Sequence, residues 1–162
     1  SIVPQVVDAI DIPVIAAGGI ADGRGFAAAF MLGAKGVQMG TRFVCAEECT
    51  VHKNYKEAIL KAKDRSTVVT GMPTGHPVRV LKNRLSRQFQ LLEKQGVDIK
   101  ELEELGMGKL RAAVVDGDID NGSLMAGQIA GLIDDILPAK VIIERIIREA
   151  EETIKKFNIR NI

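Results

Sequence analysis

The 162-residue chain contains no tryptophan, one tyrosine, two histidines and two cysteines. Two cysteines are too few for the disulfide scaffold of a small secreted domain. Cys45 and Cys49 have a CxxxC spacing, which we expect to lie on a helix, but a structural zinc site would need two further cysteine or histidine ligands. We therefore expect reduced, structural cysteines, no metal and a cytoplasmic protein.

Long apolar runs and an excess of one charge are also missing. No run approaches the roughly 20 residues needed to cross a bilayer, and no signal peptide is visible. A net charge of +1 creates no field that would attract nucleic acid or an anionic membrane. The 46% of hydrophobic residues is enough to bury the core of one ordinary domain. We expect a globular protein that binds neither nucleic acid nor membrane.

The first fifty residues alternate between helical and strand patterns. Short, apolar, β-branched runs that end in glycine are typical of parallel strands buried on both faces. The pattern predicts a helix over 2–10, a strand over 11–17, a helix over 21–34 with Asp22 as its N-cap, and a strand over 37–40. Together these elements form one parallel βαβ unit with a helix before it. The chain begins with Ser1 inside a helical pattern, so we expect further chain before it.

After residue 50 the pattern becomes mainly helical. It predicts a helix over 55–63, a strand over 66–70, a turn over 71–77, a long helix over 78–94, one or two short helices over 99–115, a polar loop over 115–122 and a closing helix over 141–157. We therefore divide the chain into an α/β part (1–50), a mainly helical insertion or lid (51–122), and a return segment with a closing helix (123–162).

Two glycine corners follow the two predicted strands. Gly18 and Gly19 end the first strand, and Gly40 with Thr41 ends the second. Parallel strands bring their carboxyl ends to one edge of a sheet, where glycine lets backbone N–H groups approach a phosphate closely. In a (β/α)8 barrel the loops after strands seven and eight form the usual phosphate site. Glycines at strand ends are often simple turns, but two in register favour a phosphate site here.

Several nearby residues admit two interpretations. Thr41 is a candidate hydroxyl donor to the phosphate. Arg42 either supplements the site or forms an ion pair at its rim. The segment from Gly18 to Gly25 does not match the G-x-G-x-x-G fingerprint, so we exclude dinucleotide binding by a doubly wound sheet.

The remaining polar candidates are weaker. His76 lies in a turn and is either a substrate contact or an ordinary loop residue. His52 is expected to be solvated. Arg79, Lys82, Arg84 and Arg87 form a basic stretch on the predicted long helix, which is either a solvated face or a docking patch for an acidic partner. The alternating Asp116, Asp118 and Asp120 lack the later glutamate of a calcium loop.

Three segments carry a resemblance to a known family. The sequence IPVIAAGGIADGRGFAAAFMLGAKGVQMGTRFV (12–44) closely resembles the nitronate monooxygenase and enoyl-acyl-carrier-protein reductase II family of FMN-dependent barrels. GHPVRVLKN (75–83) and GSLMAGQIAGL (122–132) look like the reductase branch. The resemblance implies an α/β fold: the C-terminal portion of a (β/α)8 TIM barrel, with a small, mainly helical inserted subdomain.

The resemblance also implies a cofactor site. FMN would rest its phosphate on Ala17, Gly18, Gly19, Gly40 and Thr41, and the segment of Met125, Ala126, Gly127 and Gln128 would return toward the flavin. We expect Gln128 to be a buried polar side chain whose partners include the flavin edge. The implied reaction is NADH- or NADPH-dependent reduction of trans-2-enoyl-acyl carrier protein in fatty-acid synthesis.

The chain departs from the family in one respect. The family's GGHxG motif, which supplies a histidine near the flavin, is absent, so the catalytic residue is unknown and His76 is a weak substitute. An isolated half-barrel would expose unpaired strand edges. We therefore expect a homodimer through those edges or a missing N-terminal half-barrel, with little activity in this chain alone. The alternatives are a nitronate monooxygenase that uses the same FMN with oxygen, and a non-catalytic half-barrel that binds FMN or phosphate.

Overall fold

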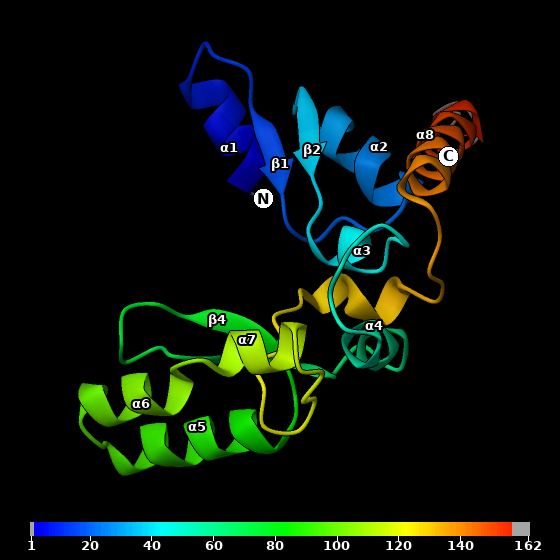
Figure 1. Cartoon of the computed structure of the whole chain (residues 1–162). Helices are drawn as coiled ribbons and strands as arrows, with labels where there is room; N and C mark the ends of the chain where they lie inside the picture. Colours follow the sequence, from blue (N-terminus) through cyan, green and yellow to red (C-terminus); the bar gives the residue numbers. More distant parts are fainter. Residues whose placement is uncertain (1, 157–162) are drawn as a thin grey trace.

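A computed structural model describes residues 2–156 of the chain (Figure 1). The N-terminal part contains α1 (Ile2–Ala9), β1 (Ile15–Ala17), α2 (Gly23–Met31), β2 (Gly36–Gln38) and the single turn α3 (Thr41–Val44). The last helix, α8 (Ala139–Lys156), returns to this part and packs along α2 (Figure 1). The predicted closing helix is thereby confirmed up to Lys156, and its remainder lies outside the described residues.

The intervening residues form a second lobe. It contains α4 (Lys53–Leu60), β3 (Thr67–Thr70), β4 (Val78–Leu81), α5 (Arg84–Gln95), α6 (Ile99–Gly106), α7 (Lys109–Val114) and the 3-10 helix η1 (Gln128–Leu132). In Figure 1 α5, α6 and α7 lie below the parallel strands, and α4 lies to the right of α7, below α3. We call the segment from β3 to α7 the hairpin lobe, since the β3–β4 hairpin lies at its centre.

The predicted βαβ unit is present in the structure as β1, α2 and β2. β1 and β2 pair in parallel, with Ala17 opposite Gln38. Asp22 is the N-cap of α2, as predicted, because its carboxylate accepts the N–H groups of Arg24 and Gly25. The carboxylate of Glu149 on α8 accepts the Gly23 N–H at 3.0 Å. A Cβ at Gly23 would lie 2.4 Å from the backbone of Ala150, so only glycine allows α2 and α8 to pack this closely.

The strands are less buried than their apolar sequence predicts. Ala16 is buried, whereas Ile15 is 55% exposed and Ala17 is also exposed. The prediction of burial on both faces is therefore wrong for the described residues. The physical reason is that the pair has only two strands, and within residues 2–156 no layer covers the face on which Ile15 and Ala17 lie.

The predicted long helix over 78–94 is also wrong at its start. Residues 78–81 form β4, which pairs antiparallel with β3. Helix α5 begins only after Asn83, whose side chain accepts the Ser86 N–H while the Ser86 hydroxyl accepts the Asn83 N–H. The β-branched alternation Val78-Arg79-Val80 and this capping box were the signals for a strand followed by a new helix.

The main core joins the hairpin lobe to the N-terminal part. It is a cluster of small and aliphatic side chains from α4, β4, α7 and the return segment, together with Cys45. Ile59 and Leu124 are almost completely buried in it. Smaller clusters lie under α2 and between α8 and β2. The return segment is therefore fixed by the same core that holds the second lobe.

Candidate flavin-phosphate site

The two glycine corners lie at the same edge of the β1–β2 pair. Gly18 and Gly19 follow β1 directly, with φ angles of 86° and 73°. These left-handed conformations are costly for any residue with a side chain. Gly40 lies two residues after the end of β2, which runs parallel to β1. The structure therefore brings both corners to one exposed edge.

Gly40 and Gly127 are the two glycines that neither a positive φ angle nor a Cβ contact closer than 3.4 Å explains. Of the 16 glycines, eight have positive φ angles, and seven of the remaining eight would place a Cβ within 4 Å of another atom. Gly40 has φ −93° and ψ −69°, which any residue adopts, and nothing lies within 4 Å of the position of its Cβ. Neither the backbone conformation nor packing against residues 2–156 requires glycine at this position. A ligand that approaches the backbone closely would require it.

Thr41 connects this edge to the return segment. Its Oγ1 accepts the N–H of Gly127 at 3.0 Å, across 86 residues of sequence. A hydroxyl that accepts one hydrogen bond keeps its own hydrogen for donation. Thr41 thus has a hydrogen to offer an anion at the glycine corners while it holds Gly127 beside them. The sequence resemblance grouped these residues, and the structure brings Thr41 and Gly127 into direct contact.

The return segment is held firmly from the side of the hairpin lobe. Met125 forms a bridge with Val80 of β4, and its carbonyl oxygen accepts the Tyr55 hydroxyl at 2.8 Å. Ala126 is buried, with its N–H donating to the Arg79 carbonyl at 3.1 Å. Burial raises the pKa of Tyr55 to about 12 even though the bond to Met125 opposes this. The tyrosine is therefore a neutral donor at physiological pH.

Gln128 does not lie where we predicted. It is exposed at the start of η1, so the expectation of a buried amide is wrong. The apolar neighbours that suggested burial are split by the 3-10 turn, which buries Ala130 and leaves Gln128 at the surface.

Replacing Tyr55 by phenylalanine is expected to lower the free energy of unfolding by about 1–2 kcal/mol, since the Met125 carbonyl loses its buried donor. Urea denaturation of both proteins measures the difference. Ser66→Ala is the control: this change removes a hydroxyl that accepts the Lys63 N–H at an exposed position, and we expect less than about 0.5 kcal/mol. Equal losses in the two variants would contradict a special role for the Tyr55 hydroxyl.

Arg42 belongs to an ion pair and not to the glycine edge. It is 6% exposed, and its Nη2 lies 3.0 Å from both the carbonyl oxygen and Oδ1 of Asp135. Arg145 of α8 binds the other carboxylate oxygen at 2.6 Å. Burial alone would raise the pKa of Asp135, but hydrogen bonds and charge from the two arginines hold it below its usual range. Arg42 therefore joins α3 to the start of α8.

The two cysteines lie in the irregular segment after α3 and not on a helix, as we had expected. Both are free thiols; Cys45 is buried and Cys49 is partly buried. Burial raises the pKa of Cys45 from 9.0 to about 11. Because the folded state holds the thiol proton more tightly, Cys45 favours folding below pH 9. This contribution to stability is lost as the pH rises toward 11. Cys45 is thus a protonated core residue.

Iodoacetamide at pH 8 is expected to modify Cys49 and spare Cys45, because alkylation requires an accessible thiolate. Mass spectrometry of the folded protein should show one modification per chain, and two after unfolding in urea. Cys49→Ala should abolish labelling of the folded protein. Labelling of both cysteines at similar rates would show that Cys45 is not held in the core.

Other predicted residues have structural partners. His52, which we expected to be solvated, is half-buried and caps α4, with Nδ1 accepting the Asn54 N–H. Asp118 accepts the N–H groups of Asp120 and Asn121 within its loop. His76 is exposed in the turn between β3 and β4. In this position it faces solvent at the rim of a pocket.

The basic stretch does not form one helix face. Arg79 lies on β4 and donates to Thr67 Oγ1 at 3.2 Å, while Arg84 and Arg87 are exposed on α5 and Lys82 precedes that helix. The strand at 78–81 breaks the patch that a continuous helix would have formed.

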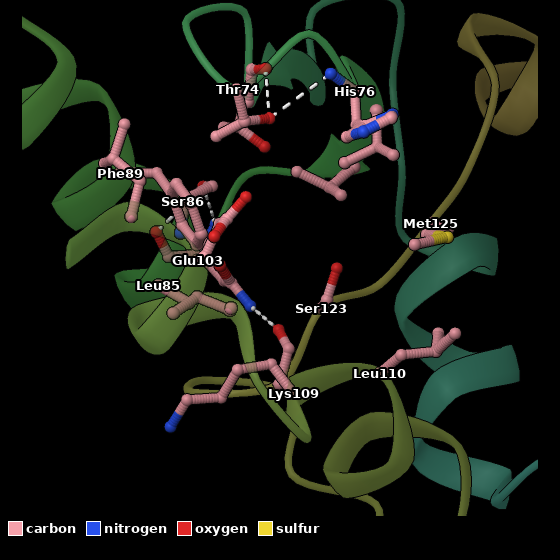
Figure 2. A pocket seen from close by; sticks show the side chains of 18 residues that line it. Thr74, His76, Leu85, Ser86, Phe89, Glu103, Lys109, Leu110, Ser123 and Met125 are labelled. Atoms are coloured by element: carbon pink, nitrogen blue, oxygen red, sulfur yellow. Dashed lines mark hydrogen bonds between the residues drawn. The ribbon is translucent and has the colours of Figure 1, made fainter. Parts of the chain in front are cut away.

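A pocket of about 230 Å³ lies inside the hairpin lobe, and sequence reasoning missed it (Figure 2). Its wall includes β4, α5, α6, α7 and Met125 of the return segment. Predicting residues 78–81 as a helix concealed it, because the pocket forms between the hairpin and the helices.

The described residues contain neither a candidate metal site nor a candidate membrane-spanning helix. Within 2–156 no group of three histidine, cysteine or acidic side chains is placed to hold a metal ion. No helix in the same range combines the length and apolarity needed to cross a membrane.

Comparison with known proteins identifies the chain's relatives. A family model described as nitronate monooxygenase matches residues 1–149. A probable nitronate monooxygenase of Staphylococcus saprophyticus is 37% identical over 96% of this chain and 44% of its own length. One from Staphylococcus aureus strain MSSA476 is also 37% identical, over 96% of this chain and 43% of its own. The chain spans less than half the length of these curated relatives.

Solved structures agree with this assignment. FabK from Thermotoga maritima is 56% identical, with a TM-score of 0.91 over 95% of this chain and 49% of FabK. A nitroalkane oxidase from Streptomyces ansochromogenes is 32% identical, with a TM-score of 0.74 over 94% of this chain and 43% of the oxidase. These neighbours are TIM-barrel enzymes, which confirms the predicted fold as the C-terminal portion of such a barrel. The chain belongs to the nitronate monooxygenase family, and within it resembles FabK.

Proposed function

We propose that this chain supplies the phosphate-binding half of the FMN site in a flavin-dependent oxidoreductase. The observation that carries the proposal is Gly40, a glycine that neither its backbone conformation nor its packing against the described residues requires. A phosphate gripped by backbone N–H groups gives such a reason. Ala17, Gly18, Gly19, Gly40 and Thr41 are the proposed phosphate contacts.

The return segment is the second part of the proposed site. Met125, Ala126, Gly127 and Gln128 follow one another beside Thr41, which fixes Gly127 through its Oγ1. Backbone groups held this rigidly orient a bound ring without reorganisation during the reaction. FMN, when bound, would accept a hydride and pass it on, while the protein orients the two substrates in turn. The exposed Gln128 amide is free to turn toward the ring edge.

The proposed reaction is NADH- or NADPH-dependent reduction of a trans-2-enoyl thioester carried by acyl carrier protein. It is supported by the 56% identity with FabK, compared with 37% for the probable nitronate monooxygenases. Nitronate oxidation with oxygen is the second candidate, since the family model and the curated relatives bear that name. Among the described residues we assign no catalytic acid, and exposed His76 remains only a weak candidate. A half-barrel that binds FMN without catalysis is the third.

Steady-state assays of the full-length gene product, loaded with FMN, test this choice. We expect NADH or NADPH oxidation that depends on a crotonyl thioester and continues without oxygen. Oxygen consumption that depends on a nitronate and needs no nicotinamide would replace the first proposal by the second. A yellow protein that is inert in both assays would support the binding module. A colourless protein that does not take up added FMN would contradict the cofactor site itself.

A further inference from the structure

The pocket in the hairpin lobe is an apolar space beside the proposed flavin site (Figure 2). Its deepest walls are Val80, Leu85 and Leu102, all at most 6% exposed. Figure 2 shows Thr74 and His76 on one side of the opening and Met125 beside it. The pocket opens to solvent and has a volume of about 230 Å³. Two larger pockets of the described chain are lined by more charged side chains, so this one best suits an apolar ligand.

The lining determines which chemistry the pocket accepts. Seven of the 18 lining residues are valine, leucine, phenylalanine or methionine, and the surface that the lining turns to the pocket is mainly apolar. The two charged residues, Glu103 and Lys109, have opposite signs. A pocket without excess positive charge does not attract an anionic ligand such as a phosphate or a nucleotide. Its volume also falls below the roughly 300 Å³ at which pockets for drug-sized ligands begin. An uncharged, flexible hydrocarbon fits these limits.

The position of the pocket selects one hydrocarbon. Met125 lines it and lies two residues before Gly127, which is bonded to Thr41 at the glycine corners. A substrate whose reacting group lies at the proposed flavin therefore has its far end beside Met125. At about 30 Å³ for each water-sized group, the space holds a chain of roughly six to eight carbons.

We propose that this pocket binds the acyl chain of a medium-length thioester substrate and so sets the preferred chain length. The inference deepens the proposed enoyl-thioester reduction and rests on it. On this proposal a four-carbon chain ends near Met125, whereas an eight-carbon chain extends four carbons further, into part of the pocket. Each buried methylene contributes roughly fourfold in affinity, so filling the pocket penalises the longer chain selectively.

Leu110→Trp tests the inference in the full-length, FMN-loaded protein. Leu110 lines the pocket but is 42% exposed, so the larger ring is expected to be tolerated. We expect the ratio of kcat/KM for trans-2-octenoyl to that for trans-2-butenoyl thioester to fall at least about tenfold, mainly through KM. The control is Leu91→Trp, which changes an exposed leucine of α5 outside the pocket and should leave the ratio unchanged. Val78→Phe fills the pocket from β4 and should repeat the effect.

A binding measurement separates this inference from the proposed function. Calorimetry with octanoyl thioester, which cannot be reduced, should show binding to the unmodified protein and at least about tenfold weaker binding to Leu110→Trp. If no enoyl thioester is reduced but this difference is found, the pocket stands and the proposed reaction fails. If reduction occurs and both chain lengths respond equally to Leu110→Trp, the reaction stands and the pocket assignment is overturned.

Discussion

Replacing Gly40 by valine is expected to weaken FMN binding at least about tenfold, while the protein without FMN keeps its stability. The backbone at Gly40 is compatible with any residue, and its Cβ position is empty. The new side chain therefore meets none of the described residues closely, but it occupies the space that a phosphate needs to reach the backbone N–H groups. Gly40→Ala should give a smaller effect in the same direction. Titration of FMN fluorescence measures the affinity.

Riboflavin and a second glycine provide the controls for Gly40→Val. Riboflavin lacks the phosphate, so its affinity should change much less than that of FMN. Gly96 ends α5 with φ 67° and nothing near its Cβ position. Gly96→Ala should therefore lower stability by about 1 kcal/mol without affecting FMN. If Gly40→Val lowers the affinity for FMN and for riboflavin equally, the phosphate does not bind at this corner.

Asp135→Ala is expected to cost about 2–3 kcal/mol of unfolding free energy. Removal of the carboxylate leaves the buried Arg42 guanidinium with only the Asp135 carbonyl oxygen as partner. An uncompensated buried charge costs about 3–5 kcal/mol, and the 29% exposure of the Asp135 side chain reduces this figure. Urea denaturation at pH 7 measures the change. Asp134→Ala, which removes an exposed neighbouring carboxylate, should stay within about 0.5 kcal/mol.

The pH dependence of Asp135→Ala provides an independent check. The pKa of Asp135 is lowered in the folded protein, so its carboxylate stabilises the fold above the ordinary aspartate pKa of about 3.9. This contribution is lost as the pH falls below that value. The difference between the unmodified protein and Asp135→Ala should therefore shrink in acid. A difference that stays constant to pH 3 would show that the ion pair is not its source.

The glycine corners and the βαβ unit could be predicted because their determinants are local. Asp22 caps its helix through the next three residues, and the apolar runs before Gly18 and Gly40 define the two strands. The parallel arrangement then places both corners at one edge. The Thr41–Gly127 hydrogen bond could not be derived from local patterns, because it joins residues 86 positions apart; only the family resemblance grouped them.

The errors arose where tertiary contacts outweighed local pattern. Residues 78–81 fit a helix that continues to Lys94, but pairing with β3 makes them a strand. For Arg42 the sequence left two alternatives open, and the structure shows the ion pair, with Asp135 as the partner. Gln128 sits among apolar residues and still faces solvent. The strand at 78–81 depends on pairing with β3, the Arg42 ion pair on a residue of the return segment, and the exposure of Gln128 on a local 3-10 turn.

The insertion of the hairpin lobe between β2 and α8 has a consequence for the family's diversity. The chain leaves the N-terminal part near Ala46 and returns to it at Leu137. These two residues form a β-bridge with each other. A segment that starts and finishes at one point can be lengthened, shortened or exchanged without moving the strands on either side of it. Changes of substrate can then be made within this segment, while the glycine corners stay in place.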